Sequence, residues 1–127
     1  MSTLALIELQ HHTLAIPHHH IFAIERCSRS QRNVRLNGQQ WELMDLDDDL
    51  QWRPGIDYAA PFVVCFRNST LALRCARVDS IPVSNSVPLP PIMQGPDTLV
   101  EGFVPHPERL VLIVNMSALL RAQSYAA

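Results

Sequence analysis

Five of the six histidines in this chain lie within ten residues, in the segment HHTLAIPHHH at positions 11–20. Imidazole is a common ligand of Zn²⁺, but a zinc site needs three or four ligands that converge on one ion. We expect residues 4–16 to form a hairpin with His11 and His12 at its tip. His18–His20 would then lie roughly 20 Å away, at about 3.3 Å per residue of strand. The two clusters could not share an ion, so we predict surface histidines and no metal site.

The acidic run DLDDDL at positions 45–50 places Asp45, Asp47 and Asp49 at alternate positions, as in a calcium loop. An EF-hand loop also needs glycine at its sixth position and glutamate at its twelfth, where this chain has Leu50 and Ile56. We therefore interpret the run as a solvated helical turn that follows a strand.

Arginine recurs at every third position in the next candidate, as Arg26, Arg29, Arg32 and Arg35. On a helical turn such a row could contact phosphates or carboxylates. No aromatic residue alternates with these arginines, and the formal net charge of −2 gives no general attraction for nucleic acid. We interpret the row as a solvated connection and predict no nucleic-acid partner.

The sequence contains no G-x-S-x-G, Walker A or G-x-G-x-x-G motif, so we predict a protein that is not an enzyme and holds no cofactor. No apolar run approaches the roughly 20 residues of a membrane span. The start, MSTLALIEL, lacks the basic residues of a signal peptide, and we expect no direct membrane insertion. Cys27, Cys65 and Cys75 show no C-x-x-C spacing, which favours reduced thiols and a cytoplasmic location.

The elements that must position these residues are strands. With 127 residues, of which 47% are hydrophobic and 17% charged, the chain is long enough for one domain with a substantial core. Short apolar runs between turn residues predict strands at 4–9, 13–16, 21–25, 33–37, 40–45, 99–104 and 109–115. A break at 53–55 separates two halves, and the proline-rich segment 84–96 predicts an extended loop. This pattern indicates an all-β fold of small barrels or a sandwich.

The segment PFVVCFRNSTLALRC at 61–75 predicts a hairpin that turns at Asn68 and Ser69. Its pairing places six side chains on one face, with Phe62 opposite Cys75, Val64 opposite Leu73 and Phe66 opposite Leu71. Cys65 would point to the other face, so it could not bridge Cys75. We expect Asn115 to cap a closing helix whose apolar face has Met116, Leu119 and Leu120. The predicted core includes Val64, Leu73, Leu112 and Val114.

The chain resembles the CheW-like domain family in four segments that follow one another in the family's order. LVEGFVPHPERLVLIVNMSALL (99–120) is similar to the closing strands and helix of that family, and FVVCFRNSTLALRCARVDSI (62–81) to its central hairpin. LALIELQHHTLAIPHHHIFAIE (4–25) resembles the opening hairpin, and LNGQQWELMDL (36–46) resembles the motif L-R-G-x-x-[IVL]-P-[IV]-x-D-L. The resemblance covers about residues 3–121.

This resemblance implies one CheW-like domain over 1–127, with a first half of about 1–53 and a second half of about 54–127. The fold would be all-β, with two small SH3-like five-stranded barrels that share a core and a short C-terminal helix. The implied function is that of a non-catalytic cytoplasmic adaptor. It would couple a methyl-accepting chemoreceptor to a CheA-like histidine kinase through a partner-binding surface that includes Ile24, Leu36, Asn37, Gly38 and Val78.

Two positions depart from the family's pattern, since Asn37 replaces its arginine and Glu42 its following proline. We therefore expect weak binding to a typical receptor, while binding to the CheW-like domain of a kinase persists. A divergent pathway, such as a type IV pilus chemosensory system, fits these departures. The alternative hypothesis is a divergent sensor of a small ligand or metal that uses the histidine-rich face.

Overall fold

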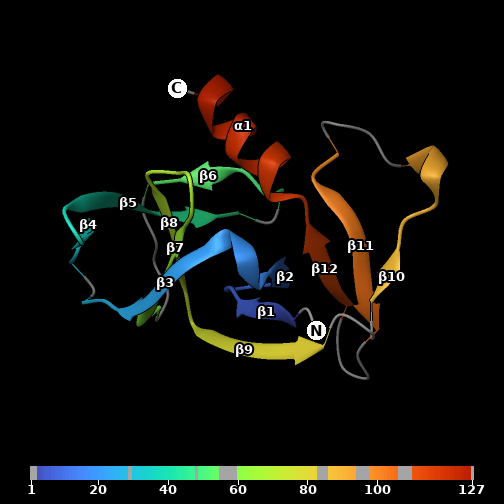
Figure 1. Ribbon diagram of the computed structural model, residues 1–127, viewed down its shortest axis with the longest axis horizontal. Helices are drawn as coiled ribbons and strands as arrows, with labels where there is room; N and C mark the ends of the chain where they lie inside the picture. The colour runs from blue at the N-terminus through green and yellow to red at the C-terminus, as the bar shows by residue number, and fades with distance from the viewer. Residues whose placement is uncertain are drawn as a thin grey trace.

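The computed structural model describes residues 3–28, 30–47, 49–54, 60–82, 86–93, 98–105 and 110–126. The protein consists mainly of short strands in two curled sheets, with one α-helix near the C-terminus (Figure 1). This arrangement confirms the all-β fold class that the sequence predicts, including its C-terminal helix.

The first sheet has six strands in the order β10-β11-β12-β2-β1-β9. They are β1 (Thr3–Glu8), β2 (Thr13–Pro17), β9 (Arg77–Pro82), β10 (Val87–Pro88), β11 (Val100–Pro105) and β12 (Leu110–Val114). Neighbouring strands are antiparallel except β12 and β2, which are parallel. The sheet has one strand more than the five expected for a barrel, because the proline-rich segment contributes the two-residue strand β10 at its edge.

The second sheet has the order β3-β7-β8-β5-β4, and β6 pairs separately with β5. Its strands are β3 (Ile21–Arg26), β4 (Asn33–Leu36), β5 (Gln39–Leu46), β6 (Trp52–Arg53), β7 (Phe62–Phe66) and β8 (Leu71–Cys75). The hairpin of β7 and β8 has the predicted register, with Phe62 opposite Cys75 and Val64 opposite Leu73. Strands β5 and β8 are parallel.

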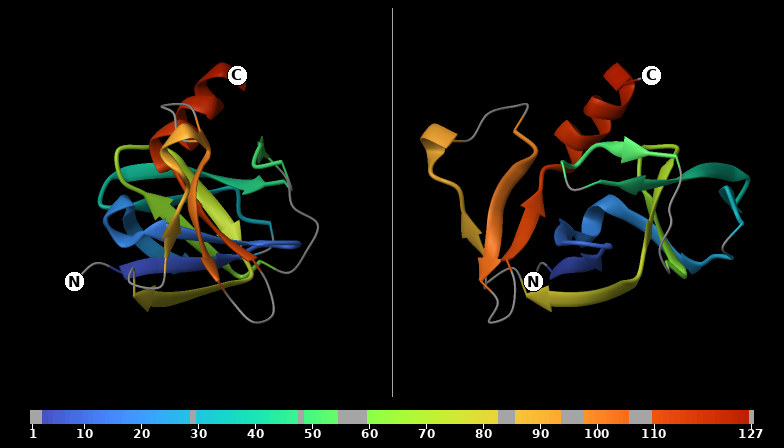
Figure 2. Two further views of the ribbon diagram at one scale, coloured as in Figure 1. Left: turned by 90° about the vertical axis from the view of Figure 1, so that its right-hand side faces the viewer. Right: turned by 180° about the vertical axis from the view of Figure 1, so that it is seen from behind.

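Each sheet contains strands from both sides of the break that the sequence predicts at 53–55. Strands β1 and β2 join β9–β12, whereas β3, β4 and β5 join β7 and β8. The chain passes from the second sheet to the first at Ala76, between β8 and β9, where the Ala76 N–H donates to the Glu8 carbonyl at 2.9 Å. The views in Figure 2 show β9, the edge strand of the first sheet, near the bottom of the molecule.

Three apolar clusters hold the fold together. The largest is shared by both sheets and the helix, and its buried members include Ile7, Leu14, Val64, Phe66, Leu73, Val114 and Leu119. Each sheet also encloses a small cluster of its own, with Leu4, Ala15, Val104, Val111 and Ile113 in the first and Val34, Trp41, Leu43, Val63, Cys65 and Ala72 in the second. Two small β-units thus share one core, as the resemblance implies.

One predicted core residue lies at the margin of the shared cluster. Val64, Leu73 and Val114 are at most 1% exposed, as expected, but Leu112 is only partly buried. It packs against the cluster from outside, so its prediction as a buried residue was too strong.

The C-terminal helix α1 (Met116–Ala126) begins at the predicted cap. The Asn115 Oδ1 accepts the Ala118 N–H at 3.3 Å, which satisfies one of the free donors at the helix start. Met116 and Leu119 are buried in the shared core, and Leu120 packs against it. The sequence therefore located both the start and the apolar face of this helix.

The acidic run begins inside β5 with Asp45 and Leu46, and Asp47, Asp49 and Leu50 lie in the connection from β5 to β6. The Asp47 Oδ1 accepts the N–H groups of Asp49 and Gln51 at 2.9 and 3.0 Å, and its Oδ2 accepts the Arg53 Nε–H at 2.8 Å. The hydrogen bond from the Gln51 N–H has the largest effect in lowering the pKa of the Asp47 carboxyl, and the hydrogen bond from the Arg53 side chain has the next largest. The Asp47 carboxylate therefore stabilises the backbone of this connection.

Candidate functional site: a groove between the two sheets

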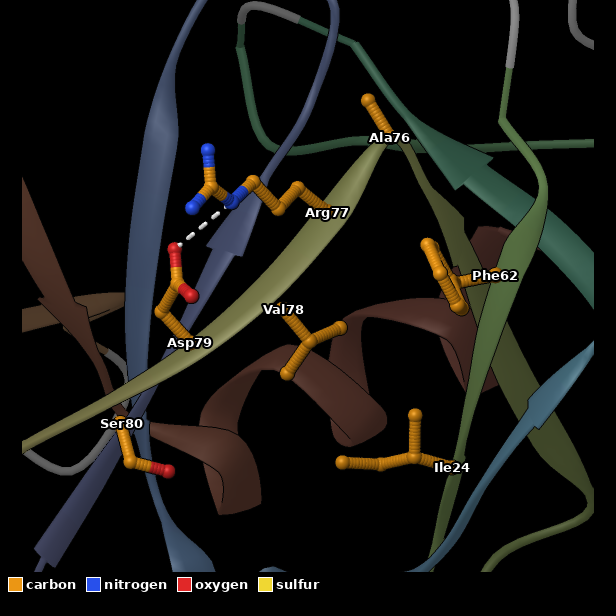
Figure 3. Close-up of a pocket in the computed structure, with 7 residues that line it drawn as sticks. All are labelled: Ile24, Phe62, Ala76, Arg77, Val78, Asp79 and Ser80. Carbon is orange, nitrogen blue, oxygen red and sulfur yellow. Dashed lines mark ion pairs between the residues drawn. The ribbon is translucent and has the colours of Figure 1, made fainter.

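An open, largely apolar groove of about 560 Å³ runs along the seam between the sheets. One wall is formed by Ile24 on β3 and Phe62 on β7, and the other by residues 76–80 on and beside β9. Figure 3 shows Ile24, Phe62 and Val78 pointing toward one another across the groove. The groove thus brings together Ile24 and Val78, two residues that the sequence singled out from different segments.

Two edge strands border the groove. Strand β3 ends the second sheet and β9 ends the first, so each pairs with a neighbour on one side only. Because side chains alternate along a strand, Val78 points into the groove, while Arg77 and Asp79 point to the other face of β9 (Figure 3). Arg77 Nε and Asp79 Oδ2 form an ion pair at 3.0 Å. Val78 thus gives the centre of the groove an apolar side chain, while Arg77 and Asp79 line its border as a mutually paired cation and anion.

Ile24 is the exposed apolar residue of this surface. Its side chain is 41% exposed, whereas Phe62 and Val78 are partly buried and pack against the shared core. Burial of apolar surface stabilises a complex by about 25 cal/mol per Å². A partner that covers Ile24 and fills the groove would therefore gain affinity without any rearrangement of the core.

Arg26 lies at the edge of the same surface. Arg26 and Phe62 are directly opposite each other in the pairing of β3 and β7, and the Arg26 guanidinium lies 5.4 Å from the centre of the Phe62 ring. This is within the range of a cation–π interaction. A cation is thus held beside an apolar groove wall.

The histidine cluster flanks the groove on the side of β9. Residues His18–His20 form the short 3₁₀-helix η1 between β2 and β3, and the His18 Nε2 lies 3.0 Å from the Ser80 Oγ. The rings of His19 and His20 are 4.1 Å apart. Partial burial, and then the charge of His19, lower the pKa of His20 below its usual value of 6.5. Among the described residues, no three histidine, cysteine, aspartate or glutamate side chains could hold one metal ion.

The remaining predicted binding residues lie elsewhere. Leu36 ends β4, and Asn37 and Gly38 form the turn between β4 and β5, at the edge of the second sheet opposite β3. Asn37 and Gly38 both have positive φ, at 50° and 79°, as a tight hairpin turn requires. Asn37 and Gly38 are exposed, whereas Leu36 packs against the small core of the second sheet. This turn and the groove are therefore separate surfaces. Of the four arginines in the row that the sequence analysis considered, Arg29 lies outside the described residues.

The cysteines have no part in the groove. All three are free, which agrees with the reduced thiols predicted from their spacing. Burial, and then the charge of Glu25, raise the pKa of Cys65 to about 11. Burial, and then the charge of Cys27, raise the pKa of Cys75 to about 12. Both thiols therefore stay protonated at neutral pH and are poor nucleophiles.

Sequence reasoning missed Phe62, which lines the groove, and Arg26, which stacks on Phe62 beside it. The sequence predicts Phe62 only as the hairpin residue opposite Cys75, and Arg26 only as one of a row of solvated arginines. A signal was present in the alternation of β3, which puts Ile24 and Arg26 on one face. Without the pairing of β3 with β7, however, nothing connected that face to Phe62.

Comparison with known proteins supports the fold. The structure is similar to that of the scaffolding protein TtCheW from Thermoanaerobacter tengcongensis, with a TM-score of 0.58. The two share 12% sequence identity over 90% of this chain and 88% of the other. No protein-family model matches the sequence, and no curated protein is significantly similar to it. The chain thus has the fold of a CheW scaffolding protein with a strongly diverged sequence. In the part that the structure describes, no helix has the length and apolarity to cross a bilayer.

Proposed function

We propose that this protein is a non-catalytic cytoplasmic adaptor that couples a methyl-accepting chemoreceptor to a CheA-like histidine kinase. Residues 1–127 would act as a single CheW-like domain. One observation carries the proposal: on a fold shared with a CheW scaffolding protein, an apolar groove with an exposed isoleucine lies at the seam between the sheets. Such a groove offers a partner a preformed docking surface, which limits the ordering cost of binding.

We assign the groove around Ile24 and Val78 to the chemoreceptor. Its walls belong to the two sheets that share the main core, so the position of one wall relative to the other is fixed by packing. Receptor side chains in the groove would contact Ile24, Phe62 and Val78, and would leave the core of the adaptor undisturbed.

The turn with Leu36, Asn37 and Gly38 is the second part of the proposed partner-binding surface. It lies at the other edge of the second sheet, so one partner could contact it while another fills the groove. Asn37 has no charge where the resemblance expects arginine, so receptor binding is expected to be weak. Binding to the CheW-like domain of the kinase is expected to persist.

A direct binding experiment tests the adaptor role. The full chain is titrated with the cytoplasmic fragment of a receptor and with the CheW-like domain of a kinase, both encoded near its gene. We expect the wild type to bind at least one of them and Ile24→Arg to lose about tenfold or more in affinity, because it buries an unpaired charge. Val87→Arg is the matched control, since Val87 is 38% exposed on β10, away from the groove.

Two results would contradict the proposal. The first is binding to neither partner. The second is equal binding by the wild type and Ile24→Arg when both have the same melting temperature. The gene neighbourhood adds an independent test of the pathway, which we propose to be a type IV pilus chemosensory system. Genes for pilus components beside those of the receptor and kinase are expected.

A further inference from the structure

The charge beside the groove suggests what kind of segment the groove receives. The Arg26 guanidinium stacks on Phe62, a residue of the groove wall. In the part of the chain that the structure describes, no other arginine stacks on a residue of this wall. Within those same described residues, no carboxylate lies within ion-pair distance of Arg26. Its side chain is exposed, and its charge is therefore open to a partner.

The neighbouring charges do not offset Arg26. Glu25 pairs with Val63 across the two strands, and its side chain lies on the opposite face of the second sheet from Arg26, near Cys65. Across the groove, Asp79 is one of the lining residues, and its carboxylate is paired with Arg77. The groove thus combines apolar side chains with a cation at its edge, Arg26, that is not paired with a carboxylate of the described residues.

We propose that the groove binds an apolar segment of a partner protein that carries an aspartate or glutamate, and that Arg26 pairs with this carboxylate. The inference rests on the proposed function in that it uses the same groove, and it specifies the chemistry of the partner. Arginine suits this role because its planar guanidinium can stack on an aromatic ring and donate two parallel hydrogen bonds to a carboxylate.

The position of Arg26 gives the pairing its specificity. The Phe62 ring restricts where the guanidinium lies, so less side-chain freedom is lost when a carboxylate binds. Ile24 lies two residues away on the same strand and the same face. A partner must therefore place its acidic group within one or two residues' distance of the apolar side chain that covers Ile24.

Selection from a displayed peptide library tests the proposal without knowledge of the partner. The immobilised full chain is used as bait in the wild-type, Arg26→Glu and Ile24→Arg forms. We expect the wild type to enrich apolar peptides with aspartate or glutamate, and Arg26→Glu to enrich peptides with lysine or arginine instead. Ile24→Arg should retain neither set, which identifies the groove as their site.

A matched pair of peptides then isolates the ion pair. One enriched peptide is compared with its glutamate-to-glutamine counterpart in titrations against wild type, Arg26→Gln and the control Arg67→Gln. We expect the acidic peptide to bind Arg26→Gln with about tenfold lower affinity than the wild type. The glutamine peptide should bind the wild type and Arg26→Gln with equal affinity. Arg67→Gln is the control for loss of an exposed arginine that stacks on an aromatic ring, because the Arg67 guanidinium lies 5.8 Å from the centre of the Phe22 ring and Arg67 does not line the groove. It should change the affinity by less than about twofold.

The outcomes separate this inference from the adaptor role. Three results would overturn the inference. The enriched peptides could show no preference for acidic residues, the wild type and Arg26→Glu could select the same peptides, or no peptide could be enriched. A receptor fragment that binds with dependence on Ile24 but not on Arg26 would overturn it and leave the adaptor role intact. Acidic peptides that bind while neither the receptor nor the kinase does would support the inference and contradict the adaptor role.

Discussion

Trp52 and Leu119, which are 67 residues apart in sequence, are joined by a hydrogen bond from the indole Nε1–H to the Leu119 carbonyl at 3.0 Å. The same indole meets the Phe66 ring edge-on, with 6.5 Å between the ring centroids. Trp52 therefore links the short strand β6 both to helix α1 and to the shared core. Trp52→Phe is expected to keep the ring packing and lose the bond, which should lower the free energy of unfolding by about 1 kcal/mol. Urea denaturation measures the change, and an unchanged midpoint would mean that the bond contributes nothing.

The shared core should respond unequally to two similar truncations. Leu73 is fully buried, so Leu73→Ala is expected to lower the free energy of unfolding by roughly 2–5 kcal/mol. Leu112 is only partly buried at the margin of the same cluster, so Leu112→Ala should cost clearly less. Chemical denaturation of the two variants side by side gives the comparison. Equal losses, or a near-neutral Leu73→Ala, would contradict the core described above.

Gly38 offers a test of backbone strain without steric interference. Its φ is +79°, and a Cβ at this position would meet no atom within 4 Å. Gly38→Val should therefore destabilise the turn of β4 and β5 only through its unfavourable φ, by about 1–2 kcal/mol. Gly38→Asn is the matched control and should cost less, because asparagine tolerates positive φ. If both variants denature like the wild type, the turn does not hold this conformation in solution.

Replacement of His18, His19 and His20 by glutamine should have little effect above pH 6.5. We expect a change of less than about 1 kcal/mol in the free energy of unfolding, because these positions lie away from the core and glutamine can still bond to Ser80. A large loss of stability, or the release of a stoichiometric bound metal, would contradict the surface role and favour the metal-sensor alternative.

The same variant should also have a flatter pH profile. The pKa of His20 is lowered in the folded protein, so the unfolded chain binds more protons once the pH falls below 6.5. The contribution of His20 to stability is therefore fully present above pH 6.5 and is lost as the pH falls toward its folded pKa. Denaturation at one pH above and one below 6.5 should show a smaller difference for the triple variant, and for His20→Gln alone, than for the wild type.

The sequence by itself determined the local elements of this protein. Strands β1 and β2, the β7 and β8 hairpin with its register, and the start of α1 at Asn115 all follow from patterns within about fifteen residues. Alternation of apolar residues specifies which face is buried, and a polar residue before an apolar run specifies a helix start. These signals are local because the interactions that produce them are local.

The tertiary structure decided how those elements combine. The parallel pairs β12 with β2 and β5 with β8 join distant segments, as at Val111 and Thr13, and no local pattern encodes such a pairing. The sequence singled out both Ile24 and Val78, but only the meeting of two sheet edges makes them opposite walls of one groove. The same assembly separates them from Asn37 and places Phe62 under Arg26. The physical reason is that each sheet buries one face in its own small core and the other in the shared core, so strand order is set by burial in three dimensions.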